Sequence, residues 1–139
     1  MKYSVDTNVL SELTKPAPSP LVVDWLRRHE TESAISSIVL GELRFGILLL
    51  PAGRKRTKLV RWFEEGVERF PVIDFDGDTA SVWAALLAKL RHSGSAMPIK
   101  DSLIAASAKR HNLMVATRNV ADFQRASVKI VNPFAAKSP

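Results

Sequence analysis

The chain has 139 residues, with 20 Lys and Arg, 14 Asp and Glu, and no Cys. This length suits one domain with a buried core, and the ordinary apolar and charged fractions exclude a disordered, collagen-like or coiled-coil protein. The lack of Cys excludes disulfides, a thiolate nucleophile and a cysteine-ligated metal site. Polar Asp6 and Asn8 interrupt the N-terminus where an export signal would be apolar, and no apolar run approaches the ~20 residues that cross a bilayer. We therefore expect a basic, cytoplasmic protein without a membrane span.

Short strands and longer helices are expected to alternate along the chain. In chain order these are a strand over residues 2–6, a helix from 20, a strand near 34–35, helices over 37–50 and 59–70, a strand over 72–75, helices from 78 and over 100–111, a strand over 113–116, a helical turn near 121 and a strand over 128–131. The Ser36–Ser37 pair and Asp78 can cap the helices that follow them, because their side-chain oxygens accept bonds from free amides. This alternation is typical of a parallel sheet flanked by helices. We predict an α/β fold with about five short strands in one domain over residues 1–139.

Two carboxylates interrupt apolar stripes on predicted helices. Glu42 shares a stripe with Ile38, Phe45 and Leu49, and Asp101 opens a stripe that continues through positions 104, 105 and 108. A carboxylate that faces a core is costly unless it is paired or bound to a cation. We therefore expect both acids to face inward because each is paired or bound to a cation.

Further polar residues follow two predicted strands. They are Asp6, Thr7 and Asn8 after the first strand, and Thr117, Arg118, Asn119 and Asp122 after the fourth. In open α/β sheets, ligands bind at the carboxyl ends of the strands. Four acids from distant parts of the chain, Asp6, Glu42, Asp101 and Asp122, are thus expected to converge at one edge of the sheet.

Such a cluster favours a divalent cation. Two carboxylates ~5 Å apart repel by roughly 3 kcal/mol at an effective dielectric of about 20. Carboxylates without Cys or a His pair favour Mg²⁺ or Mn²⁺ over Zn²⁺. Setting these four acids aside leaves 10 acids against 20 basic residues, a balance that suits a polyphosphate substrate. The pattern indicates metal-assisted phosphodiester hydrolysis.

Each acid also has an ordinary structural interpretation. Asp6 can cap a helix, and Glu42 can pair with a nearby arginine. Asp101 can be an acid of a first helical turn that the helix dipole stabilises, and Asp122 can stabilise a turn. The joint pattern is more specific than any one of its members. Seven other acids, among them Glu12, are expected on solvated helix faces or ends.

Four motifs stand in order along the whole chain: Asp6-Thr7-Asn8-Val9-Leu10, Gly41-Glu42-Leu43-Arg44-Phe45-Gly46, Asp101-Ser102-Leu103-Ile104-Ala105-Ala106, and Thr117-Arg118-Asn119 with Asp122-Phe123. Together they resemble the PIN-domain family, in particular the VapC-type, FitB-like toxins of bacterial toxin–antitoxin pairs. The resemblance implies an endoribonuclease that uses Mg²⁺, or Mn²⁺ as a substitute, and leaves 5′-phosphate and 3′-hydroxyl ends.

The resemblance also assigns roles to single residues. It implies that Asp6, Glu42, Asp101 and Asp122 are the catalytic and metal-binding acids, supported by Thr7, Asn8, Thr117 and Asn119. Some relatives carry the fourth acid at the position of Asn119 and others at that of Asp122, so the fourth ligand stays open between them.

The same resemblance implies partners. These are an RNA substrate, a cognate antitoxin whose tail crosses the active-site groove, and a second copy of the chain in a homodimer that assembles further with the antitoxin, with DNA bound only through the antitoxin. Trp25, Trp62 and Trp83 are expected either at a dimer surface or in the core. The basic run of Arg54, Lys55, Arg56, Lys58 and Arg61 is expected either to bind RNA backbone or to form a solvated face.

Two other classes were compared with this prediction. A phosphatase with an Asp nucleophile needs a second acid two residues after the first, where Asn8 stands. The alternative function is a non-catalytic module of the same fold that binds nucleic acid or the antitoxin. Inward-facing acids argue against a simple phosphate binder, because they would repel its ligand.

Overall fold

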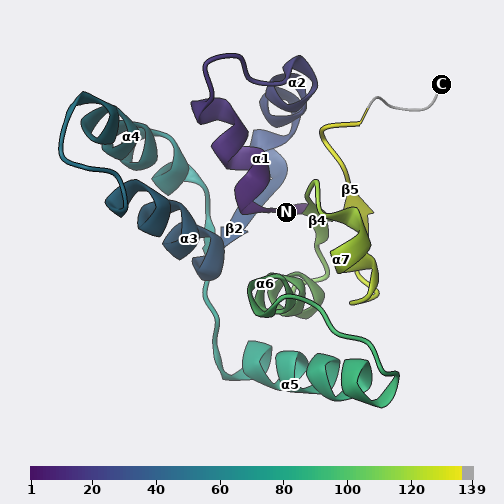
Figure 1. The fold of residues 1–139 in the computed structure, drawn as a ribbon. Coiled ribbons are helices and arrows are strands. Elements are labelled where there is room, and N and C mark those ends of the chain that lie inside the picture. The colour runs from purple at the N-terminus through teal and green to yellow at the C-terminus, as the bar shows by residue number, and fades with distance from the viewer. Residues whose placement is uncertain (136–139) are drawn as a thin grey trace.

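Five short strands pair in parallel, in the order β3-β2-β1-β4-β5, and helices lie around them (Figure 1). The computed structural model describes residues 1–135. The strands are β1 (Tyr3–Val5), β2 (Ser33–Ser36), β3 (Val72–Ile73), β4 (Met114–Ala116) and β5 (Ile130–Val131). Four of them are shorter than the sequence suggested, and β2 is longer, but their number and parallel pairing confirm the predicted α/β class. The predicted domain boundary at residue 139 lies outside the described residues.

Helices flank this sheet and connect its strands. They are α1 (Thr7–Ser11), α2 (Pro20–His29), α3 (Ser37–Leu48), α4 (Arg54–Glu65), α5 (Gly77–His92), α6 (Ile99–Arg110) and α7 (Val120–Gln124), with 3₁₀ turns at Glu12–Thr14, Glu30–Glu32 and Val67–Arg69. None of the helices within residues 1–135 is long and apolar enough to cross a membrane.

Helix boundaries follow local hydrogen bonding. The Oγ of Ser36 accepts a bond from the amide of Val39 at 3.2 Å and caps α3, as the serine pair indicated. The cap of α5 is Asp76, whose Oδ1 accepts from the amide of Thr79 at 2.9 Å. The prediction that Asp78 is the cap was wrong: Asp78 lies in the first turn, where its side chain pairs with Arg110 at 3.2 Å.

The core lies between the sheet and the helices. Val5, Ile35 and Val115 on the three central strands are fully buried, together with Ile104 of α6 and Phe123 of α7. Because Val5 pairs with Ala116 across the β1–β4 ladder, the residues that follow these two strands emerge side by side. The core thereby fixes the position of Asp6 next to Thr117.

Candidate active site

Asp6 is the buried centre of the predicted polar cluster. It follows β1, is only 3% exposed, and caps α1. Its Oδ1 accepts a hydrogen bond from the amide of Thr7 at 2.7 Å, and its Oδ2 accepts bonds from Thr117 Oγ1 at 2.7 Å and Asn8 Nδ2 at 3.2 Å. The helix-cap interpretation is therefore correct in geometry. It does not account for the two side-chain donors that hold the second oxygen.

The residues after β4 fix these donors in turn. The amide of Asn119 donates to Thr117 Oγ1 at 2.9 Å, and the amide of Arg118 donates to Asn8 Oδ1 at 3.2 Å. Thr117 and Asn8 are thus held by backbone as well as by Asp6. Both were predicted as supporting residues, and the structure places both against Asp6.

Glu42 reaches the same edge from α3. Its Oε1 accepts a hydrogen bond from Thr7 Oγ1 at 3.2 Å, and its Oε2 lies 3.9 Å from Nζ of Lys100. Its neighbouring cation is therefore a lysine of α6 and not an arginine of its own region. The sequence analysis did not predict a role for Lys100. Its position directly before Asp101, in the first turn of α6, could have indicated that it lies near the acids.

The stripe that was expected to bury Glu42 is not the core face of α3. The buried positions are Val39, Leu43 and Ile47, whereas Phe45 is 57% and Leu49 68% exposed. Glu42 lies half-buried at the border between these faces. The prediction of an inward stripe through Glu42 was wrong, and contact with Thr7, not core burial, orients this side chain.

Asp101 lies in the first turn of α6, as predicted. It is half-buried, and Ile104, Ala105 and Ala108 on the same stripe are fully buried. Helix α3 contacts both α1 and α6, and α6 contacts α7. The four helices that carry or adjoin the acids therefore meet at the end of β1 and β4.

The carboxylates act on one another electrostatically. Burial raises the pKa of Asp6, and hydrogen bonds from Thr117, Thr7 and Asn8 offset part of that effect. Burial also raises the pKa of Glu42, and the charge of Asp6 adds to it. The pKa of Asp101 is raised to about 6, first by burial and then by the charges of Asp6, Asp122 and Glu42. The other three predicted acids thus all lie within electrostatic range of Asp101.

Asp122 and Asn119 differ in what they offer this cluster. Asp122 is half-buried in α7, and its Oδ1 lies 3.6 Å from Nη1 of Arg125. Asn119 is exposed and precedes α7 without forming a side-chain cap. Its amide, not its side chain, supports Thr117. Of the two, Asp122 adds charge to the site.

The donor set suits an oxygen-preferring divalent cation such as Mg²⁺. Its side chains are carboxylates, with hydroxyl and amide groups behind them, and Mg²⁺ prefers such oxygen ligands. Lys100 lies 3.9 Å from Glu42 and Arg125 3.6 Å from Asp122, while neutral groups hold Asp6. Within residues 1–135, however, no three Asp, Glu or His side chains already stand as a closed metal site. A cation here would have to draw the acids closer together.

Glu12 was expected on a solvated surface, and that prediction was wrong. It is 6% exposed, its Oε2 accepts a hydrogen bond from the amide of Ser19 at 2.8 Å, and its Oε1 pairs with Lys15 Nζ at 2.8 Å. The lysine and the amide lower its pKa. Glu12 therefore fastens the proline-rich loop to α1, which is a structural role.

The tryptophans and the basic run fall in different settings. Trp25 is buried in the core and contacts Tyr3 edge to face, and Trp83 donates from Nε1 to Ser102 Oγ at 3.0 Å. Trp62 is partly buried against the core. The run at the start of α4 is mostly exposed and comprises Arg54, Lys55, Arg56, Lys58 and Arg61.

Comparison with known proteins agrees with this arrangement. The chain is 38% identical over 136 residues to VapC ribonuclease Y4jK of Sinorhizobium fredii, covering 94% of this chain and 96% of the relative. It is 35% identical to toxin FitB of Neisseria gonorrhoeae, covering 94% of this chain and 96% of that relative.

The solved structure of FitAB bound to an IR36 DNA fragment matches with a TM-score of 0.92 at 32% identity, covering 98% of both chains. VapBC2 from Rickettsia felis, bound to a DNA fragment from its promoter, matches with a TM-score of 0.81 at 26% identity, covering 95% of this chain and 98% of that one. The PIN domain model matches residues 3–129, and the chain belongs to the PIN domain family.

Proposed function

We propose that this protein is the toxin of a toxin–antitoxin pair and acts as a metal-dependent endoribonuclease. The observation that carries the proposal is the cluster of acids around Asp6, in which burial and then the charges of Asp6, Asp122 and Glu42 raise the pKa of Asp101 to about 6. The relatives named VapC ribonuclease and tRNA(fMet)-specific endonuclease VapC support RNA as the substrate. A basic surround supports a polyanion in general, with 20 basic residues in the chain.

Asp6, Glu42, Asp101 and Asp122 would hold the cation, which we propose to be Mg²⁺ with Mn²⁺ as a substitute. When bound, such a cation supplies Lewis-acid chemistry that polarises a phosphodiester and makes water a better nucleophile. Thr117 and Asn8 orient the carboxylate of Asp6 through its Oδ2, while Thr7 links Asp6 to Glu42.

Positive charge beside the acids has a separate role. Lys100 lies next to Glu42 and is exposed, so its ammonium can attract a phosphate to the edge of the site. Hydrolysis by water needs no protein nucleophile, which suits a chain that has no Cys. Breaking the bond between phosphorus and the 3′ oxygen would leave 5′-phosphate and 3′-hydroxyl ends.

The same proposal includes the protein partners. FitAB and VapBC2 are complexes bound to DNA, which supports a cognate antitoxin for this chain and contact with DNA only through that antitoxin. We propose a homodimer as the toxin unit, and exposed Phe45, Leu48 and Leu49 on α3 offer an apolar surface for it. The pair would act in the cytoplasm.

The test is cleavage of bulk cellular RNA with Mg²⁺, Mn²⁺ or EDTA, with Asp6→Asn beside the wild type. Internal cuts that require metal, carry 5′-phosphates and disappear in Asp6→Asn are expected. Asp78→Asn is the matched control, because Asp78 is exposed and pairs with Arg110 away from the cluster. Metal-independent RNA binding by both the wild type and Asp6→Asn, without cleavage, would instead identify a non-catalytic binding module.

A further inference from the structure

A groove of about 390 Å³ opens directly beside the acid cluster. Thr7 and Glu42, which are hydrogen-bonded to each other, belong to both the cluster and the groove wall. The rest of the wall comes from α1, the 3₁₀ turn after it, α3 and α4. Its apolar part consists of Leu43, Ile47, Leu50, Leu59 and Trp62.

Lysines mark the rim of this groove. Lys15 is held there by its ion pair with Glu12 at 2.8 Å, while Lys55 is exposed and has no ion pair within residues 1–135. Of the basic run at the start of α4, only Lys55 lines the groove. The groove therefore combines an apolar wall, an aromatic ring, two lysines and one of the four proposed acids, Glu42.

We propose that this groove seats one nucleotide of the RNA next to the bond that is cut, with its base against the apolar wall and Trp62 and its phosphate at Lys55 and Lys15. This inference rests on the proposed function and specifies how that site holds its substrate. Proteins recognise single-stranded RNA by unstacked bases that lie against aromatic and apolar side chains. The volume also falls within the ~300–1,000 Å³ of typical ligand pockets.

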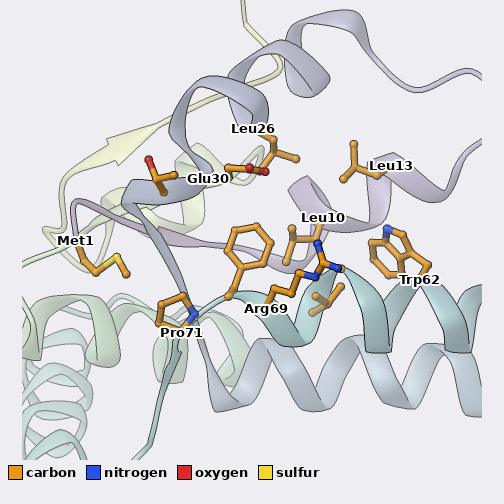
Figure 2. A pocket seen from close by; sticks show the side chains of 12 residues that line it. Met1, Leu10, Leu13, Leu26, Glu30, Trp62, Arg69 and Pro71 are labelled. Atoms are coloured by element: carbon orange, nitrogen blue, oxygen red, sulfur yellow. The ribbon is translucent and has the colours of Figure 1, made fainter.

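Charge and position favour RNA over a protein segment in this groove. A nucleotide requires a cation for its phosphate and must lie next to the scissile bond, and the groove meets both requirements through Lys55 and Glu42. A second cavity, of about 420 Å³, also has Trp62 in its wall (Figure 2). It is lined by Leu10, Leu13 and other residues but by none of the four acids, and its one acid and one arginine, Glu30 and Arg69, oppose each other in charge. That cavity lacks the two features that point to RNA.

Two substitutions test the groove without altering the acids. Gly46 lies in α3 and lines the groove, and a Cβ added to it meets no atom within 4 Å, so Gly46→Leu fills the space. Leu also favours a helix over Gly. Lys55→Gln removes the proposed phosphate contact. The matched controls are Gly77→Leu, another helical glycine with open space around its Cβ, and Lys89→Gln, an exposed lysine of α5.

The readout is the dissociation constant for short single-stranded homopolymers of A, C, G or U, measured by fluorescence anisotropy in the Asp6→Asn background. Gly46→Leu is expected to weaken binding about tenfold. Lys55→Gln is expected to weaken it and to reduce the slope of log K against log salt by about 0.7. The controls keep the affinity and slope of the Asp6→Asn protein, and thermal unfolding verifies that each variant folds.

Equal affinity of both groove variants and their controls would overturn this inference. Loss of affinity for the antitoxin alone, with RNA binding intact, would also overturn it and assign the groove to the protein partner. Failure of the proposed function would give a different result, because the wild type would then cleave no RNA with any metal. The dissociation constants of the groove variants and their controls would still show whether RNA binds in the groove.

Discussion

Replacing Asp101 by Asn should stabilise the metal-free protein and at the same time abolish RNA cleavage. The carboxylate of Asp101 is half-buried and faces the charges of Asp6, Asp122 and Glu42, which together with burial raise its pKa to about 6 from an ordinary 3.8. The folded protein therefore carries this ionised side chain at a cost. A neutral amide of nearly the same shape removes that cost.

The magnitude follows from the pKa difference. At 1.36 kcal/mol for each unit, a shift from 3.8 to about 6 corresponds to an upper limit of about 3 kcal/mol. Because the side chain is only half-buried, solvent screening reduces this to about 1–2 kcal/mol. Asn also loses the favourable interaction of an acid with the first turn of α6, which is about 0.5 kcal/mol. The net gain in the free energy of unfolding is therefore about 1 kcal/mol.

The size of this stabilisation depends on pH in a defined way. An acid whose pKa is raised in the folded state destabilises that state only when it is ionised. The penalty is absent below the unfolded value of 3.8, grows as the pH rises to about 6, and is constant above that. Asp101→Asn should thus be more stable than the wild type at neutral pH, and the difference should disappear on acidification.

Urea denaturation in EDTA, at about pH 7.5 and about pH 4, measures this difference. Asp78→Asn serves as the control, since Asp78 is paired with Arg110 and its loss should not stabilise the fold. Excess Mg²⁺ should then stabilise the wild type more than Asp101→Asn. If Asp101→Asn proves no more stable than the wild type near neutral pH without metal, the carboxylates do not strain one another as argued.

Thr117→Val should reduce the free energy of unfolding by about 2 kcal/mol, because it leaves Oδ2 of Asp6 without its shortest hydrogen bond. It should also raise the pKa of Asp6 and move the acidic limb of the rate–pH profile upward; an unchanged profile and unchanged stability would contradict the role of Thr117. Phe45→Ser should convert a homodimer into a monomer in light scattering, because Phe45 is a 57% exposed apolar side chain on α3. A dimer that survives this change must use another surface.

The sequence predicted the position of the site better than the orientation of its helices. Asp6 and Thr117 could be placed together because parallel strands end at one edge, and the structure brings them to 2.7 Å. The inward stripe of α6 was also correct. The stripe of α3 was not, because this helix carries apolar residues on more than one face, so that periodicity alone does not distinguish buried Leu43 from exposed Leu49. Packing against the sheet determines which face of α3 is buried.

The capping residue of α5 and the contacts of the proline-rich loop could not be predicted from the sequence, for a different reason. Asp76 and Asp78 are chemically alike, and only the extended backbone at Asp76 selects it as the cap of α5. Glu12 looks like a surface acid until the proline-rich loop folds back and the amide of Ser19 reaches it. Both outcomes depend on backbone geometry that residue type does not specify.

The two buried acids near α1 show how a structural carboxylate differs from one that we propose to bind metal. Glu12 is bound by a lysine and a backbone amide, its pKa is lowered, and its charge is compensated within the fold. Asp6 is also buried, but its partners are a threonine, an asparagine and an amide, all neutral, and burial raises its pKa. Neutral donors fix the direction of a carboxylate without cancelling its charge, which leaves that charge available to a cation. The fold therefore leaves the charge of Asp6 without a cationic partner, although Glu12, only six residues along the chain, is paired with Lys15. This contrast is what a site built for an external cation requires.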